Sequence, residues 1–176
     1  MEMQVEIIFA KLESDDVMVL ATGLDEAKTL VDQLAQRSVS ALFTASDQNR
    51  FAVADKLFAM GPAVIPELEK RIEKEEHPES MAHAALILFK RGSMKGVPRL
   101  IRSLRDGVGP IGTIASALAS AKIPGTSEAI AEALTRVTDP YLAVPLLETL
   151  RDLGAPLPNE ALQRLEESAP HLRRFF

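Results

Sequence analysis

The side chains best suited to binding chemistry in this 176-residue chain are basic ones that recur along one part of the sequence. Arg99 and Arg102 are three residues apart, which places them on one face of a helix. Lys70 and Arg71 precede them, and Arg136 follows them at a comparable distance. Because guanidinium groups make bidentate contacts with carboxylates, these cations predict a binding surface for an acidic partner. The alternative is an ordinary helix surface of mixed charge.

Other residue combinations do not predict a catalytic or metal site. The chain has no cysteine and three histidines, and it lacks a His-x-x-x-His or Glu-x-x-His pair for metal binding. A Gly-x-Ser-x-Gly nucleophile elbow is also absent. The Gly107-Val108-Gly109 segment precedes Pro110, which predicts a loop rather than a phosphate site. We therefore expect no enzyme activity, no catalytic residues, no cofactor and no metal.

Four carboxylates lie close to His77, but their position predicts a solvated surface. Acid–base catalysis needs two carboxylates that burial holds at different pKa values. These four lie at an expected helix end and in the loop after it, where water reaches them. They are Glu73, Glu75, Glu76 and Glu79. His83 has no pairing motif beside it, so we expect it on a helix surface rather than as a general base.

Length and composition favour one domain with a buried core. The chain carries 47% apolar residues, with 25 acidic and 20 basic side chains and a net charge of −5. No apolar run approaches the ~18 residues that cross a membrane, and the N-terminus lacks the basic segment of a signal peptide. We therefore expect a cytoplasmic protein that does not bind membranes. The absence of Trp and the single Tyr disfavour nucleic acid as a partner, because stacking aromatics would be missing.

One pattern of apolar residues recurs four times at intervals of about 32 residues. Within each copy the apolar positions are three and four residues apart, which is the spacing of one helix face. A second set with the same spacing precedes each copy, and turn residues such as Gly61-Pro62 and Gly92-Ser93 separate the sets. The repeating unit is therefore a pair of helices.

The predicted core consists of six columns of equivalent positions in the four copies. The later helix of each pair contributes Ile65/Val97/Ile130/Leu162, Leu68/Leu100/Ala133/Leu165 and Ile72/Leu104/Val137/Ala169. The earlier helix contributes Val53/Ala84/Ile114/Leu146, Ala54/Ala85/Ala115/Leu147 and Leu57/Leu88/Leu118/Leu150.

These helix pairs predict an all-α fold, a right-handed α-solenoid of about four to five pairs. One pair cannot bury its apolar face alone, whereas stacked pairs bury a continuous core. The alternative is a four-helix bundle, but a bundle gives no reason for one pattern to recur four times. The expected organisation is a single domain, with divergent helices over residues 1–46, repeats over 47–170 and a tail over 171–176.

The segments Gly61–Ile72 and Gly92–Leu104 resemble HEAT-like repeats of the short bacterial kind named after phycobilisome lyase subunits. Both have a glycine turn, an aliphatic residue followed by proline, and leucines at three- and four-residue spacing. The later copies depart from this pattern, because Ala131 and Gln163 replace the proline. The resemblance covers residues 47–170. It implies the solenoid fold with the later helices along a concave face, but no particular activity.

The N-terminal part does not follow the pattern. Residues 1–48 carry three basic and nine acidic side chains, a net −6, which suits the solvated surface of an atypical cap on the stack. Residues 25–37 predict a helix, in which Val31 and Leu34 could belong to a degenerate first repeat. Residues 3–21 favour two helices over a strand hairpin. The nearest match to the family's Asp/Arg pair is Asp47 with Arg50.

At the C-terminus, Leu172, Phe175 and Phe176 predict packing onto the last repeat, and the alternative is a partner-binding tail. Within the last pair, Pro145 predicts a kink unless its helix begins later.

These patterns favour a non-enzymatic protein–protein interaction module of the adaptor, scaffold or inhibitor type, immunity proteins included. The resemblance leaves an alternative, an enzyme subunit of the tetrapyrrole lyase or chaperone type with a chromophore pocket in the concave face. Phosphate-backbone binding of a nucleic acid by the arginines is less favoured, and its signature would be an affinity that falls steeply with salt.

Overall fold

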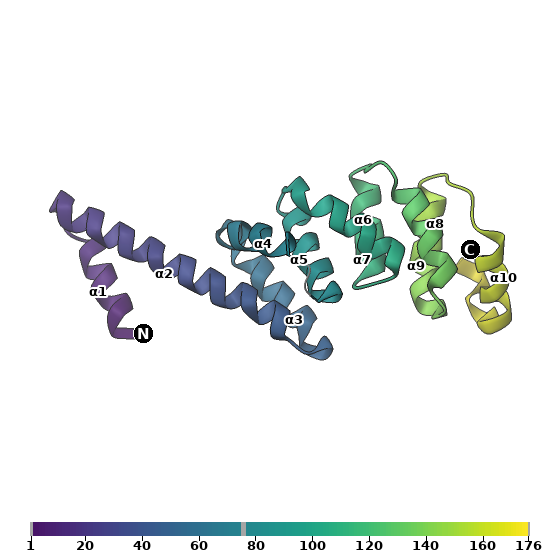
Figure 1. The fold of residues 1–176 in the computed structure, drawn as a ribbon, viewed down its shortest axis with the longest axis horizontal. Coiled ribbons are helices and arrows are strands. Elements are labelled where there is room, and N and C mark those ends of the chain that lie inside the picture. Colours follow the sequence, from purple (N-terminus) through teal and green to yellow (C-terminus); the bar gives the residue numbers. More distant parts are fainter. Residues whose placement is uncertain (1, 75–76, 176) are drawn as a thin grey trace. The chain divides into compact units, whose positions relative to one another are not determined.

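The computed structural model describes residues 2–74 and 77–175, and these ranges contain helices and connecting turns but no strand (Figure 1). The prediction of an all-α fold is confirmed. The chain divides into two compact units, Met1–Glu67 and Leu68–Phe176, and the division falls within α4 (Ile65–Ile72). Among the described helices, none combines the length and the apolar character needed to cross a bilayer.

The first unit is a helical hairpin followed by a third helix. In Figure 1, α1 lies along α2, and α2 also packs against α3 and the short 3-10 helix η1. The four elements are α1 (Glu2–Leu12), α2 (Val17–Thr44), α3 (Asp47–Ala59) and η1 (Gly61–Val64). The prediction of two helices over residues 3–21, rather than a strand hairpin, is confirmed.

The hairpin is held by a helix cap and by a close approach of its helices. Asp16 caps α2, because its carboxylate accepts a 2.8 Å hydrogen bond from the backbone N–H of Met18. A Cβ on Gly23 would lie 2.8 Å from the Cβ of Lys11, so glycine at this position lets α1 approach α2. The Lys11 Nζ atom forms a 2.5 Å ion pair with Glu26 on the same side of the hairpin.

The predicted role of residues 25–37 in a degenerate repeat is wrong. These residues lie in the middle of one 28-residue helix, and Val31 and Leu34 are exposed rather than in a core. The helix is long because no proline interrupts it and Gly23 is tolerated inside it. The buried positions of α2 are Gly23, Ala35, Val39 and Leu42.

Within the second unit, helices pack against the helix two places further along the chain. α7 packs against α9, α6 against α8, and α8 against α10. By their place in the predicted helix pairs, we call α5, α7 and α9 the first-row helices, and α4, α6, α8 and α10 the second-row helices. Their bounds are α5 (Pro78–Lys90), η2 (Met94–Gly96), α6 (Val97–Asp106), α7 (Ile111–Ser120), α8 (Thr126–Arg136), α9 (Pro140–Asp152), α10 (Asn159–Ser168) and η3 (Pro170–Phe175).

Most of the predicted core columns are buried. Leu68, Leu100, Ala133 and Leu165 are at most 3% exposed, and Leu100, Ala133 and Leu165 belong to one common core. The columns of the first-row helices behave alike, since Leu88, Leu118 and Leu150 are also buried. The half-buried exceptions lie at the ends of columns or of helices, and they are Val53, Ile65, Val97, Val137 and Leu162.

Two glycines and an aspartate set the turns of this unit. Gly107 ends α6 in the left-handed conformation with φ 69°, which costs glycine little. Gly96 precedes α6 where the chain meets α5, and a Cβ there would lie 2.5 Å from the Ala85 carbonyl oxygen. Asp139 caps α9, which begins at Pro140 with Pro145 inside it, so the alternative of a later start is wrong. The kink at Pro145 stays a prediction.

The C-terminal segment is only partly described. Leu172 is buried, as the predicted docking of the tail requires, and the His171 ring lies 6.4 Å from the ring of Tyr141. The side chain of Phe175 and the residue Phe176 lie outside the described part, so their predicted packing stays a prediction.

Candidate binding surface on the second-row helices

All five cations predicted to bind a partner belong to second-row helices. Lys70 and Arg71 lie in the last turn of α4, Arg99 and Arg102 in α6, and Arg136 is the last residue of α8. The structure brings Arg99 and Arg102 to one open cleft of about 410 Å³. The described residues that line the cleft are Glu69, Ile72, Glu73, Lys95, Pro98, Arg99 and Arg102, so Lys70 and Arg71 are not part of it.

One wall of this cleft is an ion pair. Lys95 Nζ lies 2.6 Å from Glu69 Oε2, and the Ser93 hydroxyl donates a 2.8 Å hydrogen bond to the other carboxylate oxygen. The hydrogen bonds from Lys95 and Ser93 lower the pKa of the Glu69 carboxyl. The same contact with Glu69 raises the pKa of the Lys95 ammonium group. The sequence pattern does not predict the pairing of Glu69 with Lys95, because the two residues lie far apart in sequence and belong to no repeated column.

The predicted cations do not form an unbroken positive patch. Asp106 lies 3.7 Å from Arg102 Nε and 3.9 Å from Arg136 Nη1, so one carboxylate stands between two of the five cations. Arg105 Nε lies 3.5 Å from Glu132 on α8. Carboxylates of the second-row helices therefore alternate with the cations.

Several arginines make a second contact that the prediction of a binding surface did not include. Arg99 Nη2 donates a 3.4 Å hydrogen bond to the carbonyl of Ile72, the last residue of α4. Arg136 donates to the Arg105 carbonyl near the end of α6, and Arg164 donates to the Leu134 carbonyl near the end of α8. Each guanidinium thus reaches the C-terminal turn of the preceding second-row helix.

This contact has a clear physical reason. The last four carbonyls of a helix have no partner within the helix, and the C-terminus carries partial negative charge. A cation from the next helix donates a hydrogen bond to such a carbonyl and offsets the partial negative charge. The sequence contains a signal of this contact, since Arg99 and Arg164 occupy equivalent positions of the repeat. In α8 the equivalent position is Glu132, and Arg136, one turn later, makes the contact instead.

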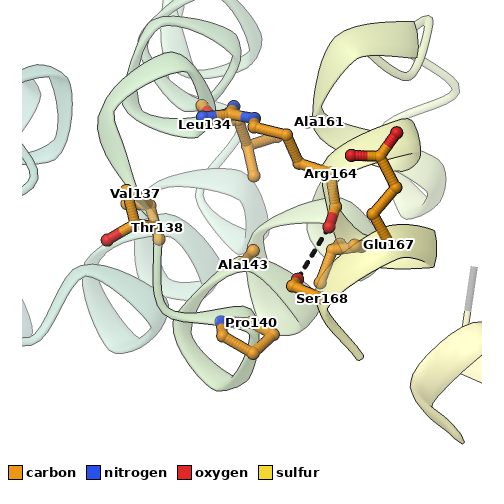
Figure 2. Close-up of a pocket in the computed structure, with 10 residues that line it drawn as sticks. Leu134, Val137, Thr138, Pro140, Ala143, Ala161, Arg164, Glu167 and Ser168 are labelled. Atoms are coloured by element: carbon orange, nitrogen blue, oxygen red, sulfur yellow. Dashed lines mark hydrogen bonds between the residues drawn. The ribbon is translucent and has the colours of Figure 1, made fainter. Parts of the chain in front are cut away.

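A second open cavity, of about 320 Å³, lies between α8, α9 and α10 (Figure 2). Its walls are mostly apolar, and Figure 2 shows Arg164 beside Glu167 and Ser168 at its α10 side. The Ser168 hydroxyl donates a 2.7 Å hydrogen bond to the Arg164 carbonyl. The lining residues are Leu134, Val137, Thr138, Pro140, Ala143, Ala161, Arg164, Leu165, Glu167 and Ser168.

The described part of the chain shows where the remaining candidate residues lie. No cluster of three or more His, Asp or Glu side chains suited to a metal ion occurs among the described residues. His83 is buried in α5, at 5% exposure, so the expectation that it lies on a helix surface is wrong. Asp47 and Arg50 do pair, at 2.6 Å, at the start of α3. Glu75 and Glu76 of the acidic cluster lie outside the described residues.

Comparison of the chain with protein-family models, with curated proteins and with solved structures gives no match. The resemblance to HEAT-like repeats therefore rests on the sequence pattern alone.

Proposed function

We propose that this protein is a non-enzymatic protein–protein interaction module, whose second unit is a short α-solenoid of the HEAT-like kind. The repeated contacts of α6 with α8 and α7 with α9 support the solenoid, because stacked pairs place equivalent helices next to each other. Adaptor, scaffold and inhibitor roles, immunity proteins included, all use such a surface.

The partner site proposed here is the cleft of Lys95, Arg99 and Arg102. The observation that carries it is the placement of these three cations around one open cavity of about 410 Å³. A guanidinium has five N–H donors, and the bond from Arg99 Nη2 to Ile72 leaves other donors of that side chain for a ligand. The chemistry of the cleft fits an Asp or Glu side chain of an acidic protein partner, bound in the bidentate manner.

The carboxylates of the cleft set its selectivity. Lys95 already forms an ion pair with Glu69, and Glu73 lines the same cavity. An incoming carboxylate would therefore contact Arg99 and Arg102 first. A densely negative polymer would meet Glu69, Glu73 and Asp106 as well. This mixture favours a folded partner with a few placed carboxylates over a phosphate backbone, whose binding depends on many cations acting together.

The test is affinity purification of partners from the native cell, followed by binding measurements with a matched pair of variants. Arg99→Gln with Arg102→Glu lowers the charge by three and keeps an N–H donor at residue 99 for Ile72. Lys90→Glu with Arg151→Gln makes the same change of charge at exposed positions of first-row helices. We expect the cleft variant to weaken binding at least tenfold, or ~1.4 kcal/mol.

The control variant should bind within about twofold of the native chain, which is well below that tenfold step. Both variants must keep the helical circular dichroism signal and the melting temperature of the native chain. If the two variants bind equally well, the cleft is an ordinary mixed-charge helix surface and the proposed site is wrong.

A further inference from the structure

The helical hairpin of the first unit carries an exposed row of apolar residues with regular spacing. Along α2 these residues follow one another at intervals of three, four, three, four and three. This is the heptad spacing of a helix that packs against another helix along a seam. The heptad seam consists of Val17, Leu20, Leu24, Ala27, Val31 and Leu34.

Only part of this heptad seam is covered within the chain. α1 packs along α2, and Leu20 and Ala27 are half-buried there. The alternate positions remain open to solvent, since Val17 is 75% exposed, Leu24 57% and Val31 46%. Isolated exposed apolar residues are ordinary on a protein surface, but a continuous row marks an interaction site.

The spacing of the heptad seam is the same when it is read in either direction. A second copy in antiparallel orientation would thus place Val17 opposite Leu34, Leu20 opposite Val31, and Leu24 opposite Ala27 of the other chain. Such a pair has a two-fold axis, and every contact occurs twice, as in most homodimers.

The charges at the ends of the heptad seam favour the antiparallel orientation. Three exposed carboxylates, Glu13, Asp15 and Asp16, lie at its N-terminal end, and the exposed Arg37 lies just beyond its C-terminal end. Antiparallel pairing places each Arg37 next to the carboxylates of the second copy. Parallel pairing would instead bring six carboxylates together, and like charges across an interface are unfavourable.

The size of the face is consistent with a weak dimer. From Val17 to Leu34 α2 extends about 26 Å, and each helix is about 10 Å wide. The hairpin face therefore covers on the order of 400 to 500 Å² in projection, or nearly 1,000 Å² for two copies, which is near the lower limit of specific interfaces.

We propose that the heptad seam is a dimerisation surface on which a second copy of this chain packs in antiparallel orientation. The proposal involves the first unit alone, so it does not depend on the partner cleft of the second-row helices. Each dimer would then carry two copies of that cleft.

Sedimentation velocity over a range of protein concentrations tests the association. The native chain should pass from monomer to dimer in the micromolar range expected of so small an interface. Leu24→Glu with Val31→Glu should abolish the dimer. Thr22→Glu with Thr29→Glu adds the same charge to exposed positions on the opposite side of α2, and should leave the dimer in place. A native chain that remains monomeric up to millimolar concentration would overturn the proposal, and so would equal behaviour of the two variants.

Cross-linking tests the orientation and does not depend on added charge. The chain has no cysteine, so Val17→Cys and Leu34→Cys each introduce a single thiol. Antiparallel pairing predicts disulfide-linked dimers when the two variants are mixed and oxidised, and none from either variant alone, because identical positions lie about 26 Å apart along the helix. Cross-linking of Val17→Cys with itself would show parallel pairing and overturn the antiparallel model.

Discussion

The two compact units of this chain are built from similar helices, but they treat apolar residues differently. In the second unit α5 is buried at every position from Ser80 to Leu88, and it packs against α6 and η2. In the first unit, the described part of α1 buries only Ile8, although the helix is equally rich in apolar residues. The composition of a helix therefore does not determine its burial.

The difference follows from the number of neighbours. A helix that is apolar on all sides is stable when it packs on all sides. In the second unit α5 has two such neighbours, because both α6 and η2 pack against it. α1 packs against α2 within its own unit, so Ile7 and Phe9 remain on the surface. Substitutions that remove equal groups from the two units should therefore have unequal effects.

The largest expected difference is between Leu100→Ala and Met18→Ala. Leu100 is fully buried, and truncation of such a leucine leaves a cavity that costs ~2–5 kcal/mol of unfolding free energy. Met18 is 76% exposed on α2 outside the heptad seam, so its truncation should cost less than ~0.5 kcal/mol. Urea unfolding followed by circular dichroism measures both. Equal costs would show that the core columns are wrongly assigned.

A smaller difference is expected between Gly96→Ala and Gly23→Ala. At Gly96 the new Cβ would lie 2.5 Å from a backbone oxygen of α5, so helix and turn must separate, at a cost of about 1–3 kcal/mol. At Gly23 the new Cβ would meet the Cβ of Lys11 at 2.8 Å, but alanine also favours the helix by about 1 kcal/mol.

We therefore expect Gly96→Ala to lower the melting temperature more than Gly23→Ala does. Gly61→Ala is not a suitable control, because its φ of 72° adds backbone strain of a different origin. If Gly23→Ala instead has the lower melting temperature, the packing of α1 against α2 tolerates an added methyl group no better than the packing of the Gly96 turn against α5.

The recurrent apolar columns predicted the second unit well. Leu68, Leu100, Ala133 and Leu165 are buried because a periodic pattern reports directly on which helix face meets a core. The pattern could not predict α2, whose 28 residues form one helix. The helix begins at Val17, and nothing local to residues 25–37 indicates a start so far before them.

The candidate cleft was less predictable for a different reason. Arg99 and Arg102 could be paired from their spacing, because both lie on one helix. Glu69 and Lys95 meet through packing of neighbouring repeats, and the hydrogen bonds of Arg99, Arg136 and Arg164 to helix ends depend on the same packing. Such contacts require the distance between helices, which a pattern in one sequence does not contain.

Removal of equivalent helix caps should also affect the two units differently. Asp16 caps α2 in the first unit and Asp139 caps α9 in the second, each by accepting backbone hydrogen bonds. Alanine at either position should cost about 1 kcal/mol. Hydrogen exchange should rise more at Met18 after Asp16→Ala than at Tyr141 after Asp139→Ala, because the buried Ala143 helps to hold the first turn of α9. Equal increases would indicate that packing does not protect the first turn of α9.

The smallest expected effect concerns the ion pair of Glu69 and Lys95 in the cleft. The hydrogen bonds from Lys95 and Ser93 lower the pKa of Glu69 from its usual 4.5. A carboxyl whose pKa is lower in the folded chain stabilises the fold above its unfolded pKa, and this contribution is lost as the pH falls through the folded pKa. The pKa of Lys95 is raised from 10.5, so its contribution is lost only as the pH rises above that value.

The stabilisation should therefore be present between about pH 4.5 and 10.5, and strong acid should remove it. Glu69→Gln should lower the melting temperature slightly at pH 7 and not at all at pH 2, and salt should reduce the difference at pH 7 because Lys95 is exposed. Carbon-13 NMR titration of Glu69 checks the cause directly. Lys95→Met should return the pKa of Glu69 towards its usual value, whereas Lys90→Met, on first-row α5, should leave it unchanged. If the pKa of Glu69 is unchanged in Lys95→Met, Glu69 and Lys95 do not form a stable ion pair in solution.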